Sequence, residues 1–132
     1  MKINHVSICV RDLDKALEKH KEIFQIEKVE DFGTVTHEGV KAAGLSIGDF
    51  VLEFVQPLGP GAHTRFLDRR GEGMHHISFT VDDVERVRAH LLAKDIPLVD
   101  QNFRSYEDAR YIFVRPSAAN GVLIEFVSRG VV

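Results

Sequence analysis

The sequence predicts an α+β fold built from two copies of one module, and two internal echoes carry this prediction. The segment HVSICVRDLD at 5–14 returns as HISFTVDDVE at 76–85, and VLEFV at 51–55 returns as LIEFV at 123–127. The two offsets, 71 and 72 residues, are nearly equal, so the second half repeats the first half in the same order. Each half therefore opens with a strand that carries a histidine and closes with a strand that carries a glutamate.

The first half reads as strand, helix and three strands. Polar and apolar residues alternate at its start, and apolar residues then recur at helical spacing after Asp12, a preferred N-cap residue. A two-residue turn, Gly48-Asp49, indicates a hairpin. The expected elements are a strand at 3–10, a helix at 13–24, an extended stretch at 24–31 that begins a strand, and hairpin strands at 40–47 and 50–55.

The second half repeats this order. Its first strand is followed by Asp82 and Asp83, either of which can cap a helix, and Asn120-Gly121 signals a turn before the last strand. The expected elements are a strand at 74–81, a helix after the aspartates, an extended stretch at 97–103, and strands at 109–115 and 122–127.

The chain, residues 1–132, is expected to form a single domain. Module one covers about 1–57, a connector with a short helical patch covers 58–73, and module two covers about 74–132. A module of about 55 residues is marginal for separate stability, so the two modules should meet as one unit. Exposed strand edges in such small modules also make a homodimer an expectation.

Composition excludes several classes of protein. The formal net charge of −3 argues against a general nucleic-acid binder, which needs a basic excess to neutralise phosphates. No apolar run approaches the roughly 20 residues of a membrane span. The N-terminus enters the first strand directly and leaves no room for a signal peptide, which favours the cytoplasm. The single cysteine, Cys9, is expected to be a buried thiol.

The histidines and glutamates of the echoed strands are candidate metal ligands. They are His5, Glu53, His76 and Glu125. If the two halves pack about a pseudo-twofold axis, the four side chains converge on one point. Imidazole and carboxylate ligands without thiolate suit a borderline or hard divalent ion, such as Co, Ni, Mn, Fe(II) or Zn.

Each of these residues, taken singly, has a simpler interpretation. A glutamate among aliphatic strand residues can lie on an exposed sheet face, because burying it unpaired is costly. A histidine can be a hydrogen-bonded structural residue. His75 points to the opposite strand face from His76, so we expect it to be structural or to support a ligand, and not to be a ligand itself. Shared ancestry of the two halves could also preserve the residues without a function. Their repetition in both halves favours the metal site over these alternatives.

Several short motifs resemble those of one known superfamily. They are His5 in the opening strand, Glu53 four positions before Pro57, GEGMHHISF at 71–79 and GVLIEF at 121–126. They resemble the vicinal oxygen chelate superfamily, which includes glyoxalases and dioxygenases. Within it, RFLDRRGEGMHH at 65–76 and FVRP at 113–116 are similar to methylmalonyl-CoA epimerases. The likeness runs over nearly the whole chain.

The resemblance implies two βαβββ modules that form an open, cup-shaped mixed β-sheet around a divalent metal. It places the metal ligands at His5, Glu53, His76 and Glu125. It also implies a substrate, an acyl-CoA thioester such as methylmalonyl-CoA, whose α-proton is removed to give an enolate that the metal stabilises. Two bases on opposite faces would then remove and return the proton.

The resemblance assigns one base to Glu125 and the other to a glutamate in the pattern Glu-x-Gly-Val. This chain departs from that pattern, because it has His37-Glu38-Gly39-Val40. His37 stands at the position of the base, and its ordinary pKa suits proton transfer near neutrality. Glu38 is one residue late, and such a shift reverses facing in an extended segment unless a bulge intervenes. His37, Glu38 or neither could act.

A second departure lies at residues 104–110, where epimerases tend to have a glycine-rich loop and this chain has RSYEDAR. Arg104 or Arg110 could clamp a substrate carboxylate or phosphate, or could simply be solvated.

Three functions therefore compete. The first is an epimerase of a methylmalonyl-CoA-like acyl-CoA. The second is a glyoxalase-I-like lyase or isomerase that acts on a thiol adduct. Extradiol dioxygenases fit less well, because they usually carry two histidines and one glutamate, and here Glu53 fills the fourth position. The third is a small-molecule-binding protein of the resistance type, whose relatives lack the metal residues that this chain keeps.

Overall fold

The computed structural model describes residues 1–130, which form two compact units. The first-half unit comprises His5–His75, and the second-half unit comprises Met1–Asn4 together with the described residues from His76 onward. Each unit contains four neighbouring strands of mixed direction, and each is described by itself.

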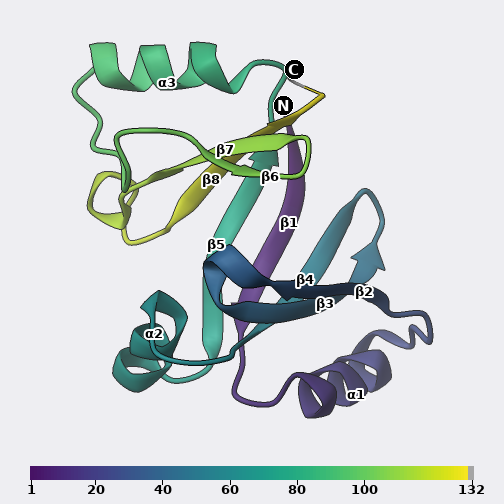
Figure 1. Ribbon diagram of the computed structural model, residues 1–132. Coiled ribbons are helices and arrows are strands. Elements are labelled where there is room, and N and C mark those ends of the chain that lie inside the picture. Colours follow the sequence, from purple (N-terminus) through teal and green to yellow (C-terminus); the bar gives the residue numbers. More distant parts are fainter. Residues whose placement is uncertain (131–132) are drawn as a thin grey trace. The chain divides into compact units, whose positions relative to one another are not determined.

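In the first-half unit, the strands stand in the order β2-β3-β4-β1 (Figure 1). β1 and β4 run parallel, and the other neighbours are antiparallel. The elements are β1 (Lys2–Cys9), α1 (Leu13–Phe24), β2 (Glu30–Val35), a 3-10 turn (Thr36–Glu38), β3 (Val40–Ile47), β4 (Phe50–Pro57) and α2 (Ala62–Arg70).

Helix α1 covers one face of this sheet, against β3 and β4 (Figure 1). The Asp12 side chain caps the helix by accepting a hydrogen bond from the Lys15 amide at 3.1 Å, and the helix ends at Gln25 in the left-handed conformation. The buried residues of this layer are Val10, Leu13, Ala16, Leu17, Ala43, Leu45 and Phe54. Because α1 occupies this face, the residues of β1 and β4 that alternate with the core residues point to the other face.

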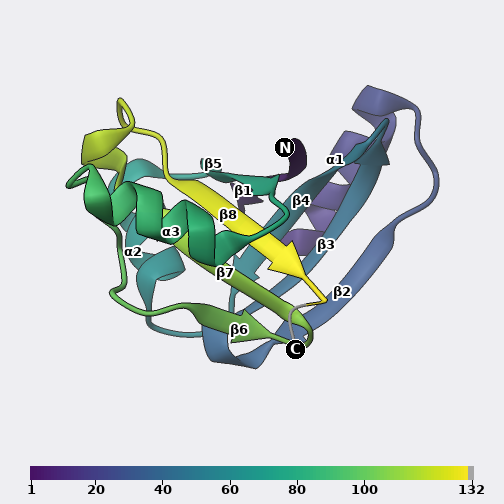
Figure 2. The same ribbon diagram turned by 90° about the horizontal axis from the view of Figure 1, so that it is seen from above.

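The second-half unit has the same plan, with the strand order β5-β8-β7-β6. β5 and β8 run parallel, and the other neighbours are antiparallel. Helix α3 lies across β8 and β7, as Figure 2 shows. The elements are β5 (Gly73–Thr80), α3 (Val84–Ala93), β6 (Arg104–Tyr106), β7 (Ala109–Val114), a 3-10 turn (Pro116–Ala118) and β8 (Ile124–Arg129).

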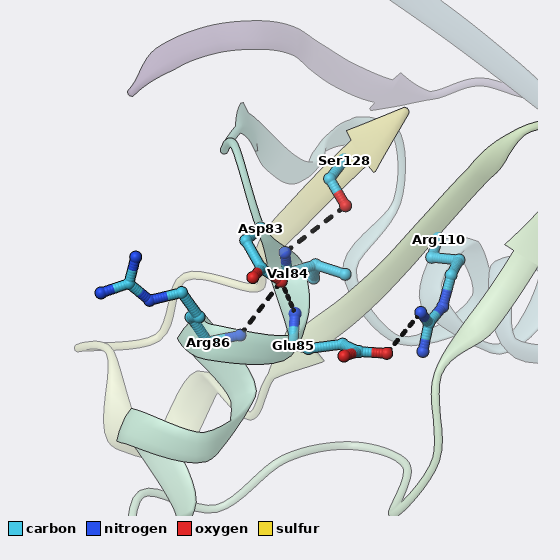
Figure 3. A network of polar contacts seen from close by, with 6 residues as sticks. All are labelled: Asp83, Val84, Glu85, Arg86, Arg110 and Ser128. Atoms are coloured by element: carbon cyan, nitrogen blue, oxygen red, sulfur yellow. Dashed lines mark hydrogen bonds and ion pairs between the residues drawn. The ribbon is translucent and has the colours of Figure 1, made fainter. Parts of the chain in front are cut away.

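Polar contacts hold the first turn of α3 to the sheet (Figure 3). Asp83 caps the helix by accepting hydrogen bonds from the amides of Glu85 and Arg86 at 3.0 and 3.3 Å. The buried Ser128 hydroxyl on β8 accepts one from the Val84 amide at 3.4 Å, and Glu85 pairs with Arg110 on β7 at 2.6 Å. These contacts fix α3 on one face of β7 and β8, which leaves the other face for the candidate site.

The predicted fold class, α+β with two βαβββ modules of mixed sheet, is confirmed. Two details were wrong. The stretch expected to be extended at 97–103 is extended only in part: Leu98 forms an isolated antiparallel bridge with Val114, and bends lie at residues 99, 101 and 102. The strand lies at Arg104–Tyr106, because the run Asp-Gln-Asn at 100–102 favours turns. The last strand begins at Ile124, since the Val122 amide is held in a turn by the Ala119 carbonyl.

No helix within residues 1–130 has the length and apolar character needed to cross a bilayer. Whether the two modules act as one domain stays a prediction.

Candidate metal centre

In the first-half unit, the parallel pairing of β1 and β4 brings a histidine, a serine and a glutamate onto one face. Ser7 lies opposite Glu53, and His5 is two positions before Ser7 on the same strand face. The His5 Nε2 atom lies 3.9 Å from Oε1 of Glu53. The sheet register therefore brings together the two residues that the sequence assigned to the metal site in this half.

The Glu53 side chain lies in surroundings where a charged carboxylate is energetically unfavourable. Its side chain is 19% exposed, and burial raises the pKa of the carboxyl from 4.5 to about 7. The nearby Ser7 hydroxyl lowers this pKa by a smaller amount. Ser7 is fully buried, and its Oγ makes no hydrogen bond of normal geometry among residues 1–130. A carboxyl group in such surroundings binds a proton or lies beside a cation.

A glycine on the neighbouring strand sets how closely β3 approaches Glu53. Gly44 lies directly opposite Glu53 in the antiparallel pair of β3 and β4. A Cβ at this position would lie 2.6 Å from the Leu52 carbonyl oxygen and 2.7 Å from Cγ1 of Val51. No sequence motif marks Gly44, because the close approach depends on the strand pairing.

We expect a Gly44→Ala substitution to destabilise the protein by about 1–3 kcal/mol, because the added methyl group must push β3 away from the β4 backbone. Urea unfolding measures this change. Gly59→Ala is the matched control, since a Cβ there meets no described atom within 4 Å. Equal unfolding midpoints for the two variants would show that the strand contact tolerates a side chain.

The second-half unit repeats the arrangement on β5 and β8. Ser78 lies opposite Glu125 in the parallel pair, and His76 is two positions before Ser78. The Ser78 hydroxyl donates a hydrogen bond of 2.5 Å to Oε1 of Glu125. His76 and Glu125 are each only 7% exposed. Each half thus presents a His-x-Ser segment beside a glutamate on a parallel neighbouring strand.

An aromatic residue, Phe113, and a cationic residue, Arg104, lie beside Glu125 and His76. Phe113 lies opposite Glu125 in the antiparallel pair of β7 and β8, so the two share a face. The His76 ring meets the Phe113 ring edge to face, with centroids 5.6 Å apart. The Arg104 guanidinium lies 5.1 Å from the Phe113 centroid and pairs with Asp100 at 2.6 Å. Arg104 therefore reaches the face that carries Glu125.

Arg110, which the sequence could not distinguish from Arg104, lies on the opposite face. Its neighbours Ala109 and Tyr111 on β7 belong to the Glu125 face, whereas Arg110 points toward α3. There it pairs with Glu85 and lies 4.0 Å from the Phe103 centroid. The alternation of β7 thus separates the two arginines, and only Arg104 is on the side of the candidate ligands.

His37 and Glu38 lie in the 3-10 turn that joins β2 and β3. The Gly39 amide closes the turn on the Thr36 carbonyl at 3.1 Å, with Gly39 in the left-handed conformation. His37 Nε2 lies 3.6 Å from Oε1 of Glu38. The strict alternation expected for an extended segment does not apply to this turn, so the one-residue offset of Glu38 does not by itself reverse its direction.

The surroundings of Cys9 and His75 are those of structural residues. Cys9 is fully buried, as expected, and burial raises the pKa of its thiol to about 11. The His75 ring stacks on the His63 ring, with the ring centroids 4.3 Å apart, and it meets the ring of Phe66 on α2 edge to face. Burial, with smaller effects of His63 and Arg70, lowers the pKa of His75 to about 3. His75 therefore stays neutral at physiological pH.

Most of the chain matches one large protein superfamily. Residues 4–114 match the Glyoxalase/Bleomycin resistance protein/Dioxygenase superfamily, and the chain belongs to it. Its relatives include mitochondrial methylmalonyl-CoA epimerases. The human protein is 31% identical over 94% of this chain and 72% of its own length, and that of Dictyostelium discoideum is 28% identical over 94% and 76%.

Solved structures give the same result. The methylmalonyl-CoA epimerase of Mycobacterium tuberculosis matches with a TM-score of 0.87 and 28% identity, over 98% of this chain and 89% of that one. A methylmalonyl-CoA epimerase in complex with methylmalonyl-CoA and NH4+ matches with a TM-score of 0.86 and 28% identity, over 99% and 96%. The resemblance found in the sequence is confirmed, and the chain is a homologue of these epimerases.

Proposed function

We propose that this protein is a metal-dependent epimerase of a methylmalonyl-CoA-like acyl-CoA thioester. The observation that carries the proposal is the repeated set of histidine, serine and glutamate, one set in each half, in a homologue of methylmalonyl-CoA epimerases. Carboxylates among apolar strand residues are costly unless a proton or a cation offsets their charge, so the presence of both pairs favours a metal-dependent function over inheritance alone.

We infer that His5, Glu53, His76 and Glu125 hold one divalent ion. Two imidazoles and two carboxylates suit Co, Ni, Mn, Fe(II) or Zn, with room for substrate oxygens in a six-coordinate shell. The raised pKa of the buried Glu53 carboxyl supports this assignment, because a cation would offset the cost of its charge. A bound divalent ion would act as a Lewis acid toward the thioester and carboxylate oxygens of the substrate.

The chain's own residues would move the proton. Glu125 is the proposed base on one side of the substrate α-carbon, and the turn at residues 36–38 supplies the base on the other side. His37 and Glu38 compete for that second role: Glu38 is the less exposed of the two, and His37 carries an imidazole, which can accept and return a proton. Arg104 is the proposed contact for a substrate anion, since it shares the face of Glu125.

Solvent deuterium incorporation at C2 of methylmalonyl-CoA, followed by mass spectrometry, tests this function. We expect incorporation with Co(II) and none with EDTA. Of the two variants His37→Ala and Glu38→Gln, the one that removes the working base should lower exchange by about 10²–10⁴-fold for the epimer whose α-proton faces the turn, while Glu125 still exchanges the other epimer. Full exchange in the other variant would remove that residue from the mechanism.

Absence of exchange with Co(II) bound would contradict the epimerase and move the search to thiol adducts, which a glyoxalase-I-like enzyme would convert. Binding of such compounds without turnover would support a binding protein of the same fold. The homodimer and the cytoplasmic location stay predictions.

A further inference from the structure

We propose that Ser78 is a positioning residue that fixes one carboxylate oxygen of Glu125 and leaves the other oxygen for the metal. This inference rests on the proposed metal centre and adds a residue to it. It starts from the hydrogen bond of 2.5 Å that the Ser78 hydroxyl donates to Oε1 of Glu125. A hydroxyl bound to one oxygen of a ligating carboxylate restricts its rotation and favours binding through the other oxygen.

The surroundings leave Ser78 little freedom. Ser78 is fully buried, and Glu125 is its register partner on the parallel strand β8. Phe113 lies on the other side of Glu125, as its antiparallel register partner on β7. The serine therefore lies on one flank of the carboxylate and the phenyl ring on the other. Substituting alanine for Ser78 removes the hydroxyl and leaves both strands in place.

The internal repeat supplies a matched control within the same molecule. Ser7 stands at the equivalent position in the first half, opposite Glu53, and is also fully buried. Among residues 1–130, however, the Ser7 hydroxyl makes no hydrogen bond of normal geometry. Ser78→Ala and Ser7→Ala delete the same atom at equivalent positions, but only the Ser78 hydroxyl makes a hydrogen bond of normal geometry, whereas the Ser7 hydroxyl has a weaker interaction with Glu53.

The experiment measures Co(II) affinity and the visible absorption of bound Co(II) in the wild type, Ser78→Ala, Ser7→Ala and Ser78→Thr. We expect Ser78→Ala to weaken Co(II) binding by about 10–100-fold and to change the absorption bands, which report ligand geometry. Ser78→Thr, which keeps the hydroxyl, should recover most of the affinity. Ser7→Ala should lose less than about tenfold.

A second readout needs neither metal nor activity. In the metal-free protein, the side-chain carboxyl ¹³C signal of Glu125 should shift in Ser78→Ala and stay unchanged in Ser7→Ala. A wild type that binds no Co(II) would overturn both the metal centre and this role of Ser78. A wild type that binds Co(II), with a Ser78→Ala variant of the same affinity and spectrum, would overturn the role of Ser78 alone. Metal binding without deuterium exchange would contradict only the epimerase.

Discussion

Alanine at His76 or at Glu125 is expected to weaken divalent metal binding by more than about 100-fold, because each substitution removes a proposed direct ligand. Removal of a residue that only supports a ligand already lowers metal affinity by about 10–100-fold. Glu125→Ala should also abolish deuterium exchange at C2, since the same carboxylate is one proposed base and a proposed ligand of the metal that would stabilise the enolate. Calorimetric titration with Co(II) and the exchange assay measure the two effects separately.

Controls for these variants come from exposed residues of the same types. His90 on α3 and Glu22 on α1 are exposed, and alanine at either position should leave Co(II) affinity unchanged. Circular dichroism should confirm folding, because Glu125→Ala leaves the Ser78 hydroxyl without its acceptor and His76→Ala removes a ring that contacts Phe113. A His76→Ala or Glu125→Ala protein that binds Co(II) as tightly as the wild type would show that the site is wrong.

The echoed segments predicted the modules and the four candidate ligands because strand periodicity is a local property. Once β1 pairs with β4 in parallel, alternation alone places His5, Ser7 and Glu53 on one face. The same rule places the corresponding residues of the second half on one face of β5 and β8. The two serines belong to the echo itself, so the repeated His-x-Ser is a signal in the sequence that could have identified them.

Other features depend on pairing between distant strands and could not be predicted in this way. Arg104 and Arg110 looked alike in one polar loop, and only the register of β6 and β7 shows that they point to opposite faces. In the sequence, nothing distinguishes Gly44 from the other nine glycines. Its pairing with Glu53 shows that a side chain at this position would contact the β4 backbone. The 3-10 turn at His37 and Glu38 broke the alternation that predicted opposite facing for these two residues.

Replacing Glu53 with glutamine is expected to stabilise the metal-free protein at pH 8 and to have little effect at pH 4. Burial raises the pKa of Glu53 from 4.5 to about 7 in the folded protein, so at pH 4 the carboxyl is protonated in both states. As the pH rises from 4.5 to 7, the unfolded chain loses this proton first, and the folded state loses stability. Above pH 7 the loss is complete, at roughly 3 kcal/mol, since one pKa unit corresponds to about 1.4 kcal/mol.

Urea unfolding in EDTA at several pH values measures this effect as the difference between Glu53→Gln and the wild type. The difference should grow between pH 4.5 and 7 and then level off, whereas Glu22→Gln on the exposed face of α1 should show no such trend. Adding Co(II) at pH 8 should stabilise the wild type, because a cation offsets the buried carboxylate that glutamine lacks. A pH-independent difference would mean that Glu53 ionises normally in the folded protein, and the main physical support for a cation at this position would be lost.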